Sequence, residues 1–387
     1  MTLYIHFPFC KSRCIYCDFF STVGSPFKSG YVERLCRELD ERGDYIPYES
    51  VSSIYLGGGT PSLFSPSALR PLFSAIREHF IVMEGAEITM ELNPDDLTPA
   101  YLQSLNHELP VNRLSMGVQS FNDRRLQFLR RRHSPTQAIR AVSMAREAGF
   151  TNISIDLMYG FPDEGLDDWL SDVRQALQLG VPHLSAYALM TEEGTPLYDM
   201  MRNGDVKAAG EETVRTMYDA LVSTLADAGY VHYEISNFCQ PGMHSRHNSA
   251  YWNGSHYLGL GAGAHSYNGR TRDWNPSSLE EYMMNPCGSW QERCREQIDD
   301  DTRYNEWVMT SLRTSSGINL DDLADRLGED RLDYLLAMAR KHLEKGTMEI
   351  TAYKPLCENE PCGSQALRFT PQGVFISDSI LADLMRV

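Results

Sequence analysis

The chain has 387 residues, 42% of them hydrophobic, which is enough to bury a core in two domains or in one large domain with an appendage. Its formal net charge of −17 argues against electrostatic binding to nucleic acid or anionic lipid, and no apolar run is long enough to predict a membrane span. The nine cysteines, an odd number, argue against a secreted disulfide framework. Together these features predict a cytoplasmic protein.

The first half of the chain alternates β-rich segments with amphipathic helical ones. Strands are expected at Leu3–Phe7, Ser53–Leu56, Glu87–Leu92, Arg113–Val118, Ile153–Met158 and His183–Leu189. Helices are expected at Tyr31–Glu41, Ser67–His79, Pro99–His107, Pro135–Ala148 and Leu166–Leu179. This alternation predicts a parallel α/β sheet, and its strand–helix units are too few for a closed eight-fold barrel. We therefore expect an incomplete (β/α)6, three-quarter TIM-like barrel.

The second half is less regular. It predicts a helix at Glu211–Ala228, a strand at His232–Ser236 and glycine-rich loops up to about residue 300. A small, mostly helical C-terminal domain follows, with expected helices at Thr302–Arg313, Leu320–Leu327, Arg331–Lys345 and Pro371–Met385 and a hairpin within Met348–Phe369. The predicted parts are a core at 1–205, a barrel extension at 206–300 and a helical, winged-helix-like domain at 301–387.

Three cysteines, Cys10, Cys14 and Cys17, follow the first predicted strand with the spacing CxxxCxxC. Cysteine thiolates are the usual ligands of a [4Fe–4S] cluster, and here the three thiolates would leave one iron without a protein ligand. Such an iron is free to bind a substrate or cofactor. A zinc site would require a fourth nitrogen or sulfur ligand, and ordinary free thiols are the remaining alternative.

Polar residues and glycines stand where the next strands end. The run from Gly57 to Thr60 (Gly57, Gly58, Gly59, Thr60) ends the second strand, Glu91 lies at the end of the third, Gln119 ends the fourth, and Asp156 lies toward the end of the fifth. Active sites of barrels are built at this edge, and glycines allow close approach of the backbone, with N–H groups free to donate. Each group alone is explained by a tight turn or a solvated strand end. Together they favour a polar ligand with amine, carboxylate and ribose groups.

The series CxxxCxxC, GGGTP, ELNP, GVQSF and IDLMYGFP resembles the radical S-adenosylmethionine (radical SAM) superfamily, and more narrowly its oxygen-independent coproporphyrinogen III oxidase-like branch. The resemblance implies a [4Fe–4S] cluster, S-adenosylmethionine as cofactor, and a reductant such as flavodoxin or ferredoxin. It assigns the cluster to Cys10, Cys14 and Cys17. It assigns the cofactor site to Tyr4, Tyr16, Gly58, Gly59, Thr60, Glu91, Gln119, Arg131 and Asp156.

Two departures separate the chain from the oxidase itself. The oxidase pattern is CxxxCxxCxC, whereas Phe19 stands at the last position here, and the oxidase has a longer segment ahead of its cluster. The string His247-Asn248-Ser249-Ala250-Tyr251-Trp252 is in turn similar to the HNxxYW signature of the heme chaperone (HemW) branch. Imidazole is a common axial ligand of heme iron, and aromatic rings pack on a porphyrin. His247 is the candidate ligand, with His244, His256 and His265 as rivals.

The sequence therefore favours a heme chaperone that binds heme, hands it to heme-requiring apoproteins and forms a possible homodimer. The first alternative is an oxygen-independent coproporphyrinogen III oxidase, which decarboxylates its substrate by radical chemistry. A radical enzyme with an unrelated substrate is the second, because substrate specificity lies in loops that carry no readable motif. Cys36, Cys239, Cys287, Cys294, Cys357 and Cys362 are expected to be ordinary thiols.

Overall fold

A computed structural model describes residues 1–387 except 48–49, 290–293, 356–362 and 387. The chain forms two compact units: the first comprises residues 1–228 and 256–296, and the second residues 229–255 and 297–387. Each unit is therefore built from two separate stretches of the chain. The domain boundaries expected from the sequence, at 205/206 and 300/301, remain predictions. Within the described residues, no helix is long and apolar enough to cross a membrane.

A mostly parallel sheet forms the centre of the first unit. Its parallel strands, in spatial order, are β11 (Tyr257–Leu260), β1 (Thr2–Phe7), β4 (Ser50–Gly58), β5 (Ile81–Leu92), β6 (Arg113–Gln119), β7 (Asn152–Tyr159) and β8 (His183–Ala188). The sheet continues beyond β11 with β12 (His265–Tyr267), β13 (Thr271–Trp274) and β14 (Arg295–Gln297). All six predicted strands are present, and β11 extends the sheet on the far side of β1.

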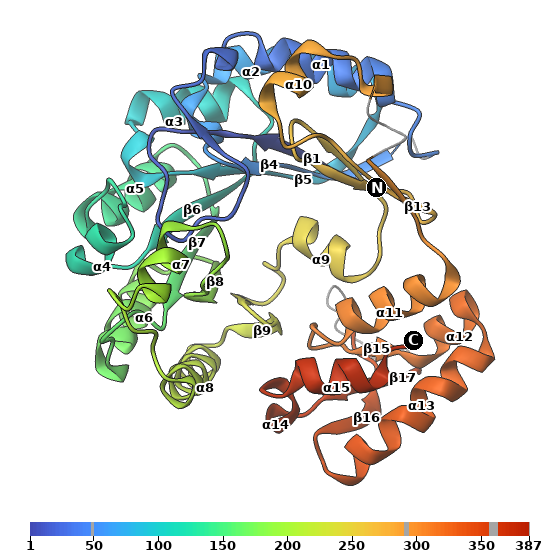
Figure 1. The fold of residues 1–387 in the computed structure, drawn as a ribbon. Helices are drawn as coiled ribbons and strands as arrows, with labels where there is room; N and C mark the ends of the chain where they lie inside the picture. The colour runs from blue at the N-terminus through green and yellow to red at the C-terminus, as the bar shows by residue number, and fades with distance from the viewer. Residues whose placement is uncertain (48–49, 290–293, 356–362, 387) are drawn as a thin grey trace. The chain divides into compact units, whose positions relative to one another are not determined.

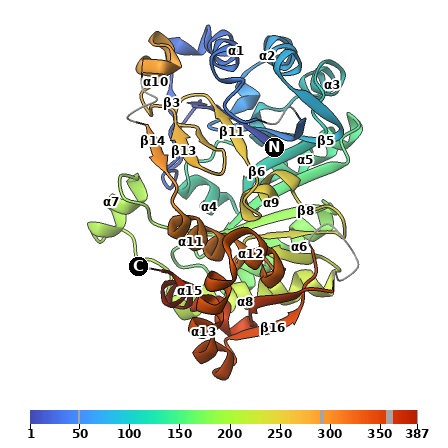
Figure 2. The ribbon, with the colours of Figure 1, turned by 90° about the vertical axis from the view of Figure 1, so that its right-hand side faces the viewer.

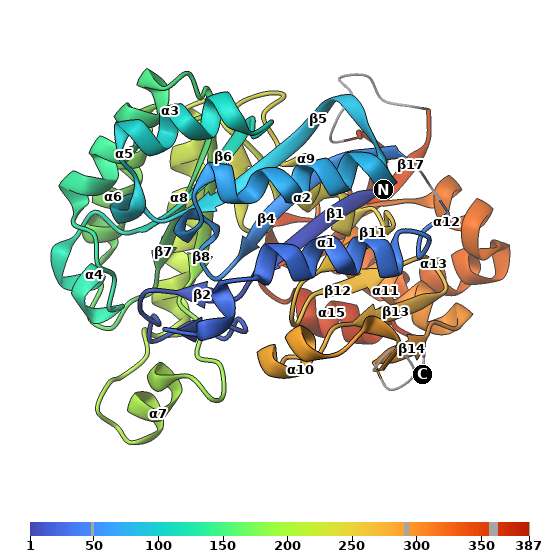
Figure 3. The same cartoon turned by 90° about the horizontal axis from the view of Figure 1, so that it is seen from above.

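Helices cover the outer face of this curved sheet (Figures 1 and 3). They are α1 (Tyr31–Arg42), α2 (Pro66–His79), α3 (Pro99–Glu108), α5 (Pro135–Glu147) and α6 (Leu166–Leu179). Several begin with a Ser or Thr cap followed by proline; the Ser65 side chain, for example, accepts a hydrogen bond from the N–H of Ala68. Buried strands and an apolar helix face form the core, as expected for an α/β fold. The incomplete-barrel prediction is thereby confirmed.

Shorter elements complete the first unit. They are β2 (Phe9–Cys10), β3 (Thr22–Val23), α4 (Asp123–Phe128), α7 (Pro196–Arg202), α8 (Glu211–Asp227) and α10 (Leu279–Met284), with short 3-10 turns at Pro26–Lys28, Pro61–Leu63, Pro94–Asp96 and Cys287–Ser289.

The second unit combines helices with a three-stranded antiparallel sheet, whose strands all lie in the second of its two stretches. Its first stretch holds β9 (Val231–Glu234), β10 (Asn237–Cys239) and α9 (Arg246–Trp252). Its second stretch holds α11 (Asp300–Ser311), β15 (Ile318–Asn319), α12 (Leu320–Leu327), α13 (Glu329–Glu344), β16 (Met348–Ala352), β17 (Gln365–Phe369), α14 (Pro371–Val374) and α15 (Ser377–Leu384). These elements lie together in Figure 1, and Figure 2 shows the longer ones from the side. One long helix was expected at Pro371–Met385, but the structure breaks it into α14 and α15.

Candidate functional site

The cysteine loop leaves the carboxyl end of β1 and is closed at its base. β2 and β3 pair in parallel, so that Cys10 lies opposite Val23 and the residues between them form the loop. Nε2 of His6, on β1, lies 2.8 Å from the carbonyl oxygen of Phe20 and fastens the far end of the loop. Cys10, Cys14 and Cys17 are all partly exposed on this loop. The fold thus brings the three predicted cluster ligands to one loop at the edge of the sheet.

Two of the three thiols accept a hydrogen bond from a neighbouring side chain, and burial raises the pKa of two of them. Nη1 of Arg131 donates to Sγ of Cys14 at 3.5 Å, and Oγ1 of Thr60 donates to Sγ of Cys10 at 3.7 Å. Burial raises the pKa of the Cys10 thiol, and burial with the nearby Cys14 and Cys10 thiols raises the pKa of Cys17 to about 11. Without a metal centre the Cys10 and Cys17 thiols are therefore protonated at neutral pH, and a bound cluster would displace those protons.

The donor set fits a cluster better than a single ion. No group of three His, Cys, Asp or Glu side chains in the described part of the chain is arranged to hold one metal ion. A [4Fe–4S] cluster instead takes each thiolate on a different iron, so its ligands do not need to converge on one point.

The glycines at the end of β4 donate hydrogen bonds within the fold. The N–H of Gly59 donates to the carbonyl oxygen of Phe7 at 2.8 Å, and that of Gly58 donates to Oε2 of Glu91 at 3.1 Å. The expectation that these N–H groups are free to donate is therefore wrong, because neighbouring strands use them. A Cβ on Gly59 would lie 2.6 Å from that Phe7 oxygen, so glycine is required for the close contact with the end of β1.

Two carboxyl groups lie on strands of the site, Glu91 one residue before the end of β5 and Asp156 within the second half of β7. Oη of Tyr55 donates to Glu91 at 2.8 Å, and burial raises the pKa of Glu91 to about 7. Burial also raises the pKa of Asp156 to about 6, against the opposing effects of a hydrogen bond from Ser185 and of the Arg113 charge. Both carboxyl groups can therefore change their proton occupancy near neutral pH.

Gln119 and Arg131 meet at the end of β6. Gln119 has a φ of 68°, in the left-handed region, where β6 shifts register against β7. A Cβ added to Gly117 would lie 3.0 Å from both Nε2 of Gln119 and Nη2 of Arg131, so the two side chains converge over Gly117. A non-glycine residue in this conformation is strained, and such strain is concentrated at functional sites.

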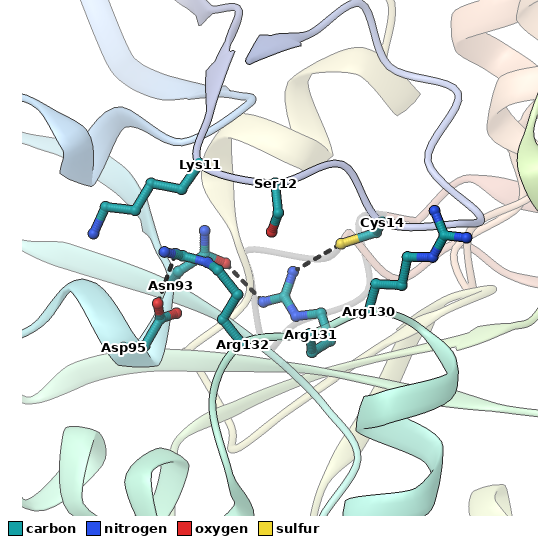
Figure 4. A pocket seen from close by; sticks show the side chains of 8 residues that line it. All are labelled: Lys11, Ser12, Cys14, Asn93, Asp95, Arg130, Arg131 and Arg132. Atoms are coloured by element: carbon teal, nitrogen blue, oxygen red, sulfur yellow. Dashed lines mark hydrogen bonds and ion pairs between the residues drawn. The ribbon is translucent and has the colours of Figure 1, made fainter. Parts of the chain in front are cut away.

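A basic pocket beside the cysteine loop shows how the three consecutive arginines differ. It is lined by Lys11, Ser12, Cys14, Asn93, Asp95, Arg130, Arg131 and Arg132 (Figure 4). Arg131 bridges the loop and the sheet, because Nη2 donates to Oδ1 of Asn93 at 2.7 Å and to the carbonyl of Gly117. Arg132 pairs with Asp95 at 2.6 Å, and Arg130 is exposed. Of the three, Arg131 is the one that contacts Cys14.

The other predicted residues lie around this edge. Oη of Tyr4 lies 2.9 Å from Nδ1 of His6, and the Tyr4 ring stacks on Tyr55. Tyr16, on the cysteine loop, packs against the apolar group of Leu129, Met158 and Phe161. Asn93 was not singled out from the sequence, although its side chain joins Thr60 to Arg131. The available signals were its position after a strand and its place in the ELNP string.

The HNxxYW string forms helix α9 in the second unit. Ser245 caps the helix by accepting a hydrogen bond from the N–H of Asn248. The His247 side chain faces Tyr251 one turn later: Nε2 lies 3.2 Å from Oη, and the rings meet at 84°. His247 is buried, whereas Tyr251 and Trp252 are partly exposed.

The rival histidines occupy other places. His244 packs against Tyr233 in the second unit, whereas His256 and His265 belong to the first. Cys357 and Cys362, expected to be ordinary thiols, lie outside the described residues.

Comparisons with known proteins agree with this geometry. Residues 4–176 match the Radical SAM superfamily. Heme chaperone HemW of Mycobacterium tuberculosis (strain H37Rv) is 36% identical over 86% of this chain and 88% of its own length. Heme chaperone HemW of Bacillus subtilis (strain 168) is 35% identical over 89% of this chain and 91% of its own. Among solved structures, coproporphyrinogen III oxidase (HemN) from Escherichia coli, a radical SAM enzyme, has a TM-score of 0.80 at 22% identity. It covers 99% of this chain and 89% of its own, a likeness of fold.

Proposed function

Because the chain belongs to the HemW family of the radical SAM superfamily, we propose that it is a heme chaperone, which binds heme and transfers it to heme-requiring apoproteins in the cytoplasm. Helix α9 is the observation that carries the proposal. It presents a histidine and a tyrosine on one face and a partly exposed tryptophan beside them. These are side chains that coordinate heme iron and pack on a porphyrin.

An unpaired polar group supports a ligand at this helix. Nε1 of Trp252 is buried and has no hydrogen-bond partner among the described residues. Such a donor is costly in a folded protein unless an acceptor reaches it. A bound molecule with anionic groups, as heme has in its propionates, would supply an acceptor.

The first unit would hold the resident cofactors. Cys10, Cys14 and Cys17 would ligate a [4Fe–4S] cluster, with Arg131 beside Cys14 to balance its negative charge. The rim residues Tyr4, Tyr16, Gly58, Gly59, Thr60, Glu91, Gln119, Arg131 and Asp156 would surround S-adenosylmethionine. When bound, the cluster supplies a one-electron centre and an open iron for the cofactor's amino and carboxylate groups. A flavodoxin or ferredoxin would reduce it, and the protein would form a homodimer.

Coproporphyrinogen III oxidation is the second candidate function, and the fold likeness to HemN favours it. Phe19 weighs against it. This side chain is 62% exposed on the cysteine loop, at the position where the oxidase pattern has a fourth cysteine. The loop therefore presents an aromatic surface where the oxidase presents a thiol.

The deciding experiment compares both activities in one preparation. Anaerobically reconstituted protein is titrated with hemin, tested for transfer of that heme to an apo-peroxidase, and incubated with coproporphyrinogen III, S-adenosylmethionine and a chemical reductant. We expect saturable heme binding and transfer without decarboxylation. Decarboxylation together with an absence of saturable heme binding would overturn the chaperone proposal and support the oxidase.

A further inference from the structure

The hydrogen bond within α9 bears on which atom binds the iron of heme. Imidazole coordinates metals through Nε2 or Nδ1, and Nε2 is the outer atom of the ring. In α9, Nε2 of His247 lies 3.2 Å from Oη of Tyr251, and the whole residue is 1% exposed. A porphyrin that approached this Nε2 would first have to displace the tyrosine.

Tyr251 is the better placed of the two side chains. It lies one turn nearer the end of the helix, next to Trp252, and both are partly exposed. Residues i and i+4 share a face of a helix, so His247 lies behind the phenol oxygen along the same face. Tyr251 is thus the more exposed residue of the histidine–tyrosine pair. Tyrosine is a known proximal ligand of heme iron.

We propose that Tyr251 is the axial ligand of heme, and that His247 is a positioning residue that holds the phenol oxygen toward the iron. This rests on the proposed heme-binding function and specifies its ligand. On binding of ferric heme, the O–H bond of Tyr251 breaks and a bond from Oη to iron forms. The proton passes to Nε2 of His247, the water on the axial site of hemin leaves, and the iron remains ferric.

Such a pair suits a protein that releases its heme. Outer-shell partners orient a metal ligand and tune its affinity, commonly by about 10–100-fold. A ligand held by such a contact can therefore bind heme less tightly than one fixed by several partners.

The test is a hemin titration of the full-length protein and its variants, followed by absorbance and electron paramagnetic resonance. Wild type is expected to show a high-spin ferric spectrum with phenolate-to-iron charge transfer. Tyr251→Phe keeps the ring and should lose this signature, with at least about a tenfold loss of affinity. His247→Ala should keep the signature but bind about tenfold more weakly. His247→Gln, whose amide oxygen accepts from the phenol, should recover part of that loss.

Tyr334→Phe is the matched control. It removes another hydrogen-bonded tyrosine hydroxyl from the second unit, one that donates to the carbonyl of Met385, and should leave affinity and spectrum unchanged. Circular dichroism confirms that each variant is folded. If Tyr251→Phe retains the wild-type spectrum and His247→Ala loses it, the ligand assignment is overturned while the chaperone proposal stands. If wild type does not bind hemin saturably, the proposed function itself fails.

Discussion

The rim of the sheet and helix α9 are built in opposite ways. At the rim, Cys14, Asn93 and Arg131 come from three distant segments and meet only in the folded unit. In α9, His247 and Tyr251 are neighbours on one helical turn. The rim is therefore a product of tertiary structure, whereas α9 needs only a formed helix to bring its pair together. If the proposed functions are right, damage to one region should leave the other working.

Removing the cluster ligands should have the largest effect. Anaerobically reconstituted wild type is expected to bind about four irons per chain, and the triple variant Cys10→Ala, Cys14→Ala, Cys17→Ala almost none. Heme affinity should be unchanged, because α9 contributes none of these ligands. Iron analysis and hemin titration measure the two effects, with Cys36→Ala as the thiol control. Loss of heme binding in the triple variant would show that the two regions depend on each other.

Arg131→Gln should damage the rim without removing a thiol. The guanidinium joins Asn93, Gly117 and Cys14, and its loss leaves partly buried acceptors unpaired. The free energy of unfolding should fall by about 2–3 kcal/mol, and the reconstituted cluster should be lost faster in air. The exposed neighbour Arg130→Gln is the control and should stay near wild type. Urea unfolding and bleaching of the cluster absorbance measure the two effects. If both substitutions have the same effect, Arg131 does not have the bridging role.

The raised pKa of Glu91, a rim residue, predicts that the free energy of unfolding depends on pH. Because burial raises its pKa from 4.5 to about 7, the folded protein holds a proton that the unfolded chain releases at lower pH. The stability contributed by this proton is fully present below pH 4.5 and is lost as the pH rises through about 7.

Glu91→Gln removes that proton equilibrium. Relative to wild type, its free energy of unfolding should improve by on the order of 2 kcal/mol between about pH 5 and about pH 8. Urea unfolding of both proteins at the two pH values measures this change. Any effect of the substitution that does not depend on pH is the same at both values and cancels. Exposed Glu147→Gln should show almost none of it. The same result for both variants would mean that Glu91 has an ordinary pKa.

The smallest expected effects come from two helix caps. They distinguish most sharply between damage to the first unit and damage to α9. Ser134→Ala removes the cap of α5 in the first unit, and Ser245→Ala the cap of α9 in the second. Each should cost about 1 kcal/mol of stability. Only Ser245→Ala should also weaken heme binding, because it frays the helix that carries Tyr251. Hemin titration of the two variants at one temperature decides this, and a weaker affinity in Ser134→Ala would contradict it.

The regular part of the fold follows from local sequence, and the short elements do not. Caps such as Ser65-Pro66 mark helix starts in the sequence, and apolar runs such as Ile153–Met158 mark the strands. β11 was missed because Tyr257–Leu260 looks like part of a glycine-rich loop until it pairs with β1. α9 was left without a predicted element because seven residues give too weak a helical pattern.

The candidate site was predictable in its residue types more than in its contacts. Strand ends in a parallel sheet meet at one edge, so Glu91 and Asp156 could be placed there from the sequence. The bond from Gly58 to Glu91 depends on the register of two strands, which no local pattern reveals. The bridging role of Asn93 is a tertiary property of the same kind.

The two-stretch construction of each unit also constrains how the chain can be made and cut. Thr2 pairs with Tyr257, so the β1 edge stays open during synthesis until residues far beyond β8 have left the ribosome. Pairing across such a separation is slow, and an open strand edge invites association with other chains. Proteolysis near residue 228 or 297 would leave fragments in which neither unit is complete. The first unit reaches its final form only after the chain has passed through part of the second, so we expect nascent chains to need protection until late in translation.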